Sequence, residues 1–198
     1  MDSIDDLDFS KTYTYADYYS WRFEERLELI KGKIFKMSPA PGANHQTIAF
    51  NISGELYNFL KNKSCKAFAA PFDVRLVRDE KSDKKVKTVV QPDICVVCDL
   101  RKVADRRSCL GAPDLVIEIL SPGNNAKEVK IKYDLYEEFG VKEYWVVYPD
   151  EQSLLRYVLN KEGKFIAEGR ALTVGDKITT PVLQGFELAL DDVFRNLI

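Results

Sequence analysis

The chain has 198 residues, of which 45% are hydrophobic and 12% aromatic. This length and composition are enough to bury a proper core, so we expect a single domain over residues 1–198. The 29 Lys and Arg residues nearly balance the 31 Asp and Glu residues, which excludes a global basic field and leaves only local phosphate-binding surfaces. The sequence has no charged-then-apolar leader and no apolar run as long as a membrane span. We therefore expect no membrane contact and a cytoplasmic location.

The N-terminal part combines a tail, a helix and a hairpin. Residues 1–12 are acidic and lack a periodic pattern, so a flexible tail is expected there. The stretch TYADYYSW predicts a short helix with Thr14 as its N-cap. In RLELIKGKIFKMSP, two short apolar runs flank Lys31 and Gly32. This pattern is typical of a β-hairpin, and Glu28 lies in its first arm.

The rest of the chain alternates between helical and extended patterns. Apolar residues at helical spacing from Asn44 to Leu60 predict an amphipathic helix, and three extended segments follow: KAFAAPFDVRLV, VKTVVQPDICVV and PDLVIEIL. A second helix is expected from Lys127 to Phe139, ended by Gly140. The apolar strand EYWVVYP, a meander of short strands and a turn of helix at LDDVFRNLI complete the chain. This order predicts an α/β fold with helices packed on a mixed sheet.

Several familiar chemistries have no basis in this sequence. The motifs GxGxxG, GxxxxGK[ST] and GxSxG are absent, so dinucleotide, P-loop and serine-hydrolase sites lack their fingerprints. His45 is the single histidine, which excludes sites built from histidine clusters. The CxxC residues Cys95 and Cys98 point to opposite faces of a strand, so we expect core thiols rather than a zinc or redox site.

A buried strand with a carboxylate at its centre is the main question that the sequence raises. Glu118 lies within APDLVIEILSP, and an unpaired carboxylate there costs several kcal/mol unless it finds a partner, a proton or a metal. Asp93 begins the preceding apolar strand in QPDICVV, and pairing of the two strands would bring both carboxylates together. Such a pair shares a proton or binds a cation, and oxygen ligands suit Mg²⁺ or Mn²⁺. A buried ion pair or a hydrogen bond at the strand end is the alternative.

Three residues of the following helix share one face, because Glu128, Lys132 and Tyr136 recur every four positions. In one interpretation Lys132 reaches the carboxylate pair and orients or activates a water molecule. In the other, Glu128 and Lys132 form an exposed pair worth a few tenths of a kcal/mol. His45 begins the earlier helix on its apolar face, where a hydrogen-bonded core histidine is the structural alternative to a role in the site.

Four motifs in a fixed order carry a resemblance to a known family: ELIKGKIFKMSPAPGANHQ, VVQPDICVV, GAPDLVIEILSP and KYDLYEEFGVKEYWVV. They resemble the Uma-type putative restriction endonuclease family of the PD-(D/E)xK nuclease superfamily, and the match runs from about Tyr13 to Phe194. The resemblance implies a restriction-endonuclease-like mixed central β-sheet flanked by helices. Here it carries an extra N-terminal hairpin and a C-terminal β meander.

The resemblance also implies roles for individual residues. Asp93 and Glu118, with the backbone carbonyl of Ile119, would hold Mg²⁺ or Mn²⁺. The superfamily lysine follows two residues after the second acid, where this sequence has Leu120, and Lys132 on the next helix would take its place.

Glu28 and His45 match further positions of the family. Glu28 would bind a second metal or hold the first through water, and His45 would be an accessory residue, as would Glu128 and Tyr136 on the helix face of Lys132. Asp114 also follows a proline, but it lies on the same strand as Glu118, so Asp93 is preferred as its partner.

Together these features predict a metal-dependent endonuclease that hydrolyses DNA phosphodiester bonds. Two alternatives stay open: an inactive nuclease-fold module that binds nucleic acid or protein, and a phosphodiesterase that acts on a substrate other than DNA. A homodimer is also expected, because restriction-type nucleases often act as dimers and isologous dimers are common. The first helix or the β meander would supply the interface.

Overall fold

The computed structural model describes residues 3–37, 41–78, 82–121 and 126–198. Within these ranges the helices are η1 (Ile4–Asp6), α1 (Tyr15–Ser20), α2 (Ala43–Leu60), η2 (Leu100–Val103), α3 (Ala126–Phe139) and α4 (Leu190–Val193). The strands are β1 (Leu27–Ile30), β2 (Lys33–Lys36), β3 (Lys66–Ala69), β4 (Val74–Arg75), β5 (Val89–Val90), β6 (Ile94–Val97), β7 (Cys109–Leu110), β8 (Leu115–Ile119), β9 (Glu143–Tyr148), β10 (Ser153–Leu159), β11 (Phe165–Ala167), β12 (Leu172–Thr173), β13 (Lys177–Thr179) and β14 (Glu187–Ala189).

The central sheet has the strand order β11-β10-β9-β8-β6-β3, with β12 paired to β10. Strands β8 and β9 are parallel, whereas β6 pairs antiparallel with both β3 and β8. A second sheet has the order β2-β1-β5-β4-β7, and β13 pairs with β14. These mixed sheets with their helices confirm the predicted fold class.

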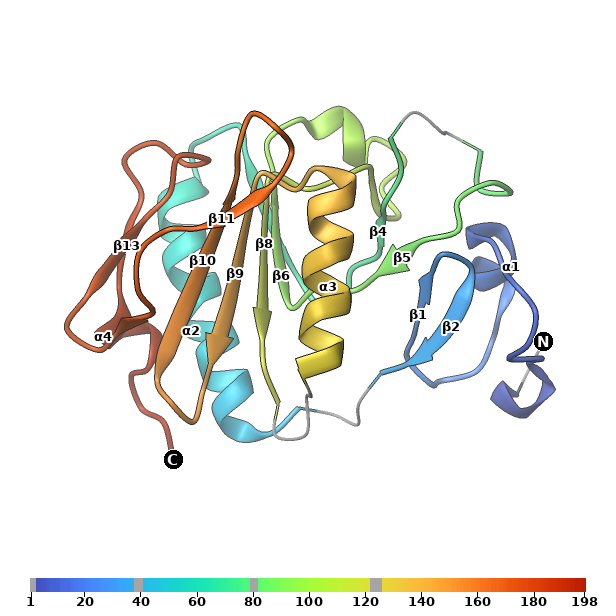
Figure 1. Ribbon diagram of the computed structural model, residues 1–198, viewed down its shortest axis with the longest axis horizontal. Coiled ribbons are helices and arrows are strands. Elements are labelled where there is room, and N and C mark those ends of the chain that lie inside the picture. The colour runs from blue at the N-terminus through green and yellow to red at the C-terminus, as the bar shows by residue number, and fades with distance from the viewer. Residues whose placement is uncertain (1–2, 38–40, 79–81, 122–125) are drawn as a thin grey trace.

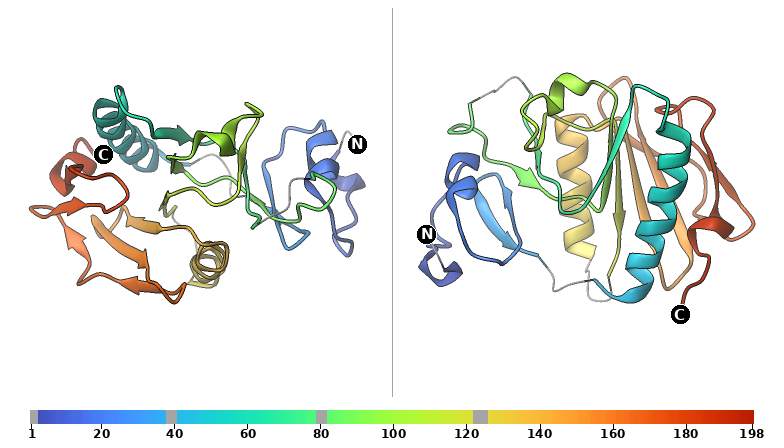
Figure 2. Two further views of the ribbon diagram at one scale, coloured as in Figure 1. Left: turned by 90° about the horizontal axis from the view of Figure 1, so that it is seen from above. Right: turned by 180° about the vertical axis from the view of Figure 1, so that it is seen from behind.

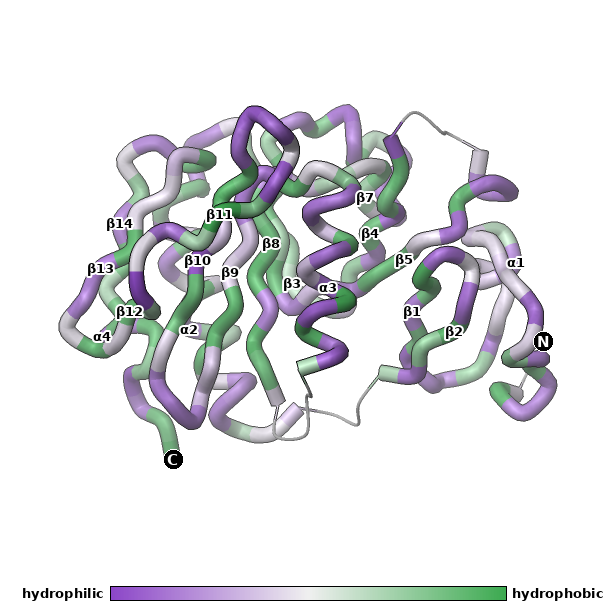
Figure 3. The backbone as a smooth tube through the Cα atoms, viewed as in Figure 1, coloured by the Kyte–Doolittle hydropathy of each residue, from purple (hydrophilic) through white to green (hydrophobic). Residues whose placement is uncertain are grey.

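The central sheet lies between two helices, with α2 on one face and α3 on the other (Figure 1, Figure 2). The β1–β2 hairpin and α1 lie beside this layered core at one end of the molecule, and β13 with α4 lies at the opposite end (Figure 1). The strands at the centre are mostly hydrophobic, whereas the loops at the periphery are mostly hydrophilic (Figure 3). Burial of the central strands between the two helices explains this distribution.

The alternation along β8 assigns its two faces to different layers. Leu115, Ile117 and Ile119 pack in the same apolar cluster as the buried residues of α2. Val116 on the other face packs with the α3 side. Because side chains alternate along a strand, Glu118 must share the α3 face of the sheet.

Local chemistry explains where several elements begin and end. Thr14 caps α1 through a reciprocal capping box with Asp17, as the sequence predicts. The hairpin turn contains Lys31 and Gly32, both at positive φ, and Gly140 adopts φ 81° directly after α3. A glycine reaches this region without the steric cost of a side chain, so the predicted turn and helix end are confirmed.

The N-terminal segment differs from the flexible tail that the sequence predicts for residues 1–12. Ser3 caps η1, and the side chains of Ile4 and Leu7 are buried against Leu27 of β1. Ile4 and Leu7 therefore pack this otherwise acidic segment against the hairpin through Leu27. Residues 1–2 of that prediction lie outside the described residues.

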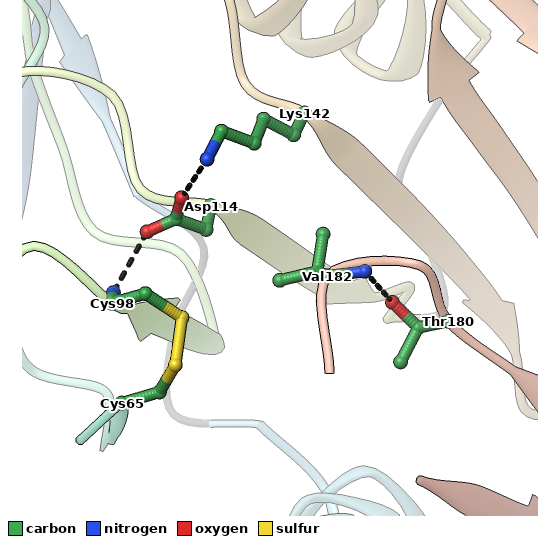
Figure 4. Close-up of a disulfide and its surroundings, with 6 residues drawn as sticks. All are labelled: Cys65, Cys98, Asp114, Lys142, Thr180 and Val182. Atoms are coloured by element: carbon green, nitrogen blue, oxygen red, sulfur yellow. Dashed lines mark hydrogen bonds and ion pairs between the residues drawn. A yellow bond between two sulfur atoms is a disulfide. The ribbon is translucent and has the colours of Figure 1, made fainter. Parts of the chain in front are cut away.

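The cysteines require a correction. Cys98 forms a disulfide with Cys65, so it is not the core thiol that the sequence predicts (Figure 4). The reason is the antiparallel register of β3 and β6, in which Lys66 lies opposite Val97 and the flanking cysteines face each other. Cys95 is free and buried, as predicted.

Among the described residues, no helix combines the length and the apolar character that crossing a bilayer requires.

Candidate active site

The predicted site residues converge on a cavity of about 190 Å³. The residues that line this cavity come mainly from the β1–β2 hairpin, the start of α2, the end of β8 and the first half of α3. Seven of the residues predicted from the sequence line it: Glu28, His45, Asp93, Glu118, Ile119, Glu128 and Lys132. Tyr136 is fully buried and contacts the site through Glu118.

Sheet register brings the two predicted carboxylates together. Strands β6 and β8 pair antiparallel with Ile94 opposite Ile117, so the next pair along the register is Asp93 and Glu118. Oδ2 of Asp93 also accepts a hydrogen bond of 2.7 Å from the backbone N–H of Ile119. The strand pairing predicted from the sequence therefore places both acids at one edge of the pocket.

The Glu118 carboxylate is held by two groups of α3. Its Oε1 accepts a hydrogen bond of 2.5 Å from the Tyr136 hydroxyl and one of 3.2 Å from Nζ of Lys132. Burial raises the pKa of Glu118 to about 7; the Lys132 ammonium opposes this shift, and the negative charges of Asp93 and Glu28 add to it. The environment thus disfavours the ionised carboxylate in spite of its two donors.

Lys132 lies between two carboxylates rather than in solvent. Its Nζ is 2.5 Å from Oε1 of Glu28 and 3.2 Å from Oε1 of Glu118, and its side chain is 19% exposed. Burial by itself lowers the pKa of Lys132, but the charges of Glu118 and Glu28 raise it overall. The alternative of an exposed Glu128–Lys132 pair is therefore wrong for Lys132.

His45 contacts the other acid of the pair. Its Nε2 lies 3.3 Å from Oδ2 of Asp93, and its side chain is 8% exposed. Burial by itself lowers the pKa of His45, but the hydrogen bond and the charge of Asp93 raise it overall, with a further contribution from the Ile119 backbone. His45 is thus both a buried histidine and a direct neighbour of the predicted site.

A supporting network around Gln91 was not predicted from the sequence. The Gln91 N–H donates to Oε1 of Glu28 at 2.8 Å, and its side-chain amide donates to Asp73 and to the Tyr18 hydroxyl. Arg26 donates to the Gln91 side-chain oxygen through Nε and Nη2. The position of Gln91 in QPD, two residues before Asp93, is the one signal that points to it.

The oxygen atoms of the acid pair fit a divalent cation. Among the described residues, the bonds to this pair end on Oε1 of Glu118 and on Oδ2 of Asp93. Two carboxylates with a backbone carbonyl are ligands of the kind that Mg²⁺ accepts, with water or phosphate at its other positions. Within the described ranges, no three His, Cys, Asp or Glu residues are grouped closely enough to bind a metal by themselves.

Asp114, the other acid that follows a proline, has a structural role. Its carboxylate accepts the backbone N–H of Cys98 at 2.7 Å and pairs with Nζ of Lys142 at 2.6 Å (Figure 4). It precedes β8, whereas Glu118 lies near the end of that strand. Both carboxylate oxygens of Asp114 therefore have partners outside the pocket.

A larger cavity of about 1210 Å³ lies near the end of α3. Several of its charged groups have partners: Lys164 pairs with Glu137, and Lys102 donates to the carbonyl of Ala112. Size alone would favour this cavity, but the smaller one contains the convergent buried ionisable groups that are typical of active sites.

Comparison with known proteins identifies the family of the chain. The model of the Uma2 family, described as "Putative restriction endonuclease", matches residues 15–191. An uncharacterized protein of Synechocystis sp. is 25% identical over 186 residues, which cover 91% of this chain and 90% of that protein.

A crystal structure supports the same fold. It is described as a putative nuclease belonging to DUF820 from Anabaena variabilis, with a TM-score of 0.69 and 20% identity, and the match covers 92% of this chain and 97% of that one. Because the family model spans most of the sequence, the chain belongs to the Uma2 family of putative restriction endonucleases.

Proposed function

We propose that this protein is an endonuclease that uses a divalent metal ion to hydrolyse DNA phosphodiester bonds. The observation that carries the proposal is the ammonium group of Lys132, which lies 3.2 Å from Glu118 in the pocket that Asp93 also lines. Two acids with an adjacent lysine are the set that the nuclease resemblance implies. The family match and the fold of the nuclease-like neighbour support the same activity.

Asp93, Glu118 and the carbonyl of Ile119 would hold Mg²⁺ or Mn²⁺. Such an ion would supply Lewis-acid chemistry by polarising the scissile phosphate and lowering the pKa of a water molecule. Lys132 would position the attacking water and offset the charge that develops on the phosphate. These roles divide the site into a side that binds the cation and a side that carries fixed positive charge.

The neighbouring residues would position these groups. Tyr136 donates to Glu118 and thereby fixes the orientation of its carboxylate, and His45 acts in the same way on Asp93. Glu28 contacts Lys132 at 2.5 Å, which favours a positioning role over binding of a second metal. Glu128 also lines the pocket and would be an accessory residue.

Cleavage assays on plasmid DNA, single-stranded DNA and a small phosphodiester, each with Mn²⁺, Mg²⁺ or EDTA, test the proposal. We expect cleavage of DNA that requires the cation and is lost in Lys132→Met and Glu118→Gln. Asp134→Asn is a matched control, because Asp134 is an exposed acid on α3 that pairs with Lys130. DNA binding without cleavage would favour an inactive binding module, and cleavage of only the small ester would favour a phosphodiesterase with another substrate.

We also propose that the protein acts in the cytoplasm as a homodimer. Restriction-type nucleases often act as dimers, and isologous dimers are common among soluble proteins. Light scattering of the purified protein tests the oligomeric state. A monomer at working concentration that still cleaves DNA would overturn this part of the proposal.

A further inference from the structure

One face of the β1–β2 hairpin forms a wall of the pocket. In the hairpin register Glu28 lies opposite Phe35, and the N–H of Met37 donates to the carbonyl of Arg26 at 3.1 Å. Cross-strand partners share a face of the sheet, as do residues two apart on one strand. Arg26, Glu28, Ile30, Phe35 and Met37 therefore share one face, and all five line the pocket.

Phe35 is the exposed aromatic residue of this wall. It is 37% exposed and belongs to none of the apolar clusters formed by the described residues. A singly exposed aromatic residue is ordinary on a protein surface, but this one lies directly across the hairpin from Glu28, which holds Lys132. Phe35 thus lies on the strand next to Glu28, whose carboxylate contacts Lys132, the residue proposed to offset charge on the phosphate.

Positive charge accompanies this aromatic surface. Arg26 uses Nε and Nη2 to contact Gln91 and lies on the same face as Phe35. Lys36, the neighbour of Phe35 in sequence, also lines the pocket, although it belongs to the other face of the hairpin and its ammonium group lies 5.2 Å from the centroid of the Phe9 ring. Cations beside an aromatic ring are a combination by which proteins bind unpaired nucleotides, because bases stack on the ring while cations contact the backbone. Here the cations Arg26, Lys36 and Lys132 line a pocket that also contains four carboxylates.

The size of the pocket agrees with partial entry of a polymer. Its volume of about 190 Å³ is below the roughly 300 to 1,000 Å³ of pockets that enclose a whole drug-sized ligand. A base within a duplex is stacked on both of its faces by its neighbours and cannot offer a face to Phe35, whereas an unpaired base can do so.

We infer that the pocket takes DNA in which a nucleotide next to the scissile phosphate is unpaired, and that its base stacks on Phe35. The inference rests on the proposed nuclease function, because that function places a phosphate beside Lys132. The preferred substrates are then single strands, flaps and bulges rather than intact duplex.

Binding in EDTA tests the inference separately from cleavage. Short DNA strands that carry the fluorescent base 2-aminopurine at different positions are titrated with the full chain, alone and as duplexes. We expect single strands to bind more tightly than duplexes, with a fluorescence change at one position.

Phe35→Ala should weaken single-strand binding by about 10-fold, within the range measured for loss of one stacked base, and Phe35→Trp should retain it. Phe50→Ala is the matched control, because Phe50 is 80% exposed on α2 and does not line the pocket.

The outcomes separate the two proposals. Equal affinity for strand and duplex, or an affinity for single strands that Phe35→Ala leaves unchanged while circular dichroism shows it folded, would overturn the inference even if the protein cleaves DNA. Binding of single strands that depends on Phe35, without cleavage of any substrate in Mn²⁺, would support the stacking surface and overturn the nuclease proposal.

Discussion

Nζ of Lys132 lies closer to the Glu28 carboxylate, at 2.5 Å, than to the Glu118 carboxylate, at 3.2 Å. Glu28 comes from the N-terminal hairpin and Lys132 from α3, so this contact joins segments 104 residues apart in the sequence. The N–H of Gln91 fixes the same Glu28 oxygen. The hairpin is therefore part of the site, because it determines where the ammonium group lies.

The first prediction is that Glu28 acts through Lys132. Lys132→Met should lower kcat/KM for DNA cleavage by about 10²- to 10³-fold, the usual loss for one electrostatic donor. Glu28→Gln should lower it by about 10- to 100-fold, as loss of a supporting residue does. The double variant should be no slower than Lys132→Met, because removal of the lysine leaves Glu28 nothing to position. Steady-state kinetics of the four proteins measure this coupling.

Additive losses in the double variant would contradict a positioning role. They would instead favour direct action of Glu28, such as binding of a second metal, one of the two roles expected for Glu28 from the sequence. Asp134→Asn again serves as the control on α3 and should retain wild-type kinetics.

Much of the site followed from the sequence because its positions depend on local periodicity and strand order. Alternation along the segment around Glu118 and the start of the strand after Asp93 were enough to predict their pairing. The four-residue spacing of Lys132 and Tyr136 was enough to place both on one helix face, and both reach Glu118.

Other contacts depend on tertiary structure that no local pattern encodes. Gln91 connects Glu28, Asp73 and Tyr18 from three separate segments, and the sequence marks it by nothing except its place in QPD. The two-residue strand β7 exists through its pairing with β4, since a strand of that length has no periodicity of its own. The Cys65–Cys98 disulfide likewise depends on the register of β3 with β6, which the CxxC spacing does not reveal.

The second prediction concerns this disulfide, which closes a loop with a sequence separation of 33 residues. Constraint of the unfolded chain by a loop of that size stabilises a fold by about 3 to 4 kcal/mol in the chain-entropy model. A reductant should therefore lower the melting temperature of the wild type and leave that of Cys65→Ser unchanged. Equal responses of the two proteins, or two free thiols at these positions in the purified wild type, would contradict the disulfide.

The third prediction is a pH dependence of stability that arises from Glu143. Its side chain is fully buried and accepts hydrogen bonds from Trp145 and Thr180, yet burial raises its pKa above the ordinary value of 4.5. A carboxyl with a raised folded-state pKa favours the fold at low pH, and this contribution is lost as the pH rises through the folded-state pKa. Wild-type stability should thus fall, relative to Glu143→Gln, as the pH rises above about 4.5.

Urea denaturation of both proteins across this pH range measures the difference. A constant difference between wild type and Glu143→Gln at all pH values would show that Glu143 has the same pKa in both states. Glu187→Gln, an exposed residue that pairs with Lys177, should show no comparable trend.

The fourth prediction is that Mn²⁺ stabilises the fold through the acid pair. A ligand that binds the folded state alone stabilises it by about 2.7 kcal/mol at 100 times its dissociation constant, so Mn²⁺ should raise the wild-type melting temperature. Asp93→Asn and Glu118→Gln should lose most of this rise, and Asp134→Asn should keep it.

In EDTA, Glu118→Gln should be as stable as the wild type or more so. Burial and the charges of Asp93 and Glu28 disfavour the ionised form of Glu118, and Lys132 keeps Glu28 as a partner. Removal of one member of a buried ion pair without such compensation costs about 3 to 5 kcal/mol. A loss of that size in EDTA, with no effect of Mn²⁺ on the wild type by melting or by calorimetric titration, would show that Glu118 serves the fold through Lys132 and Tyr136 and holds no metal.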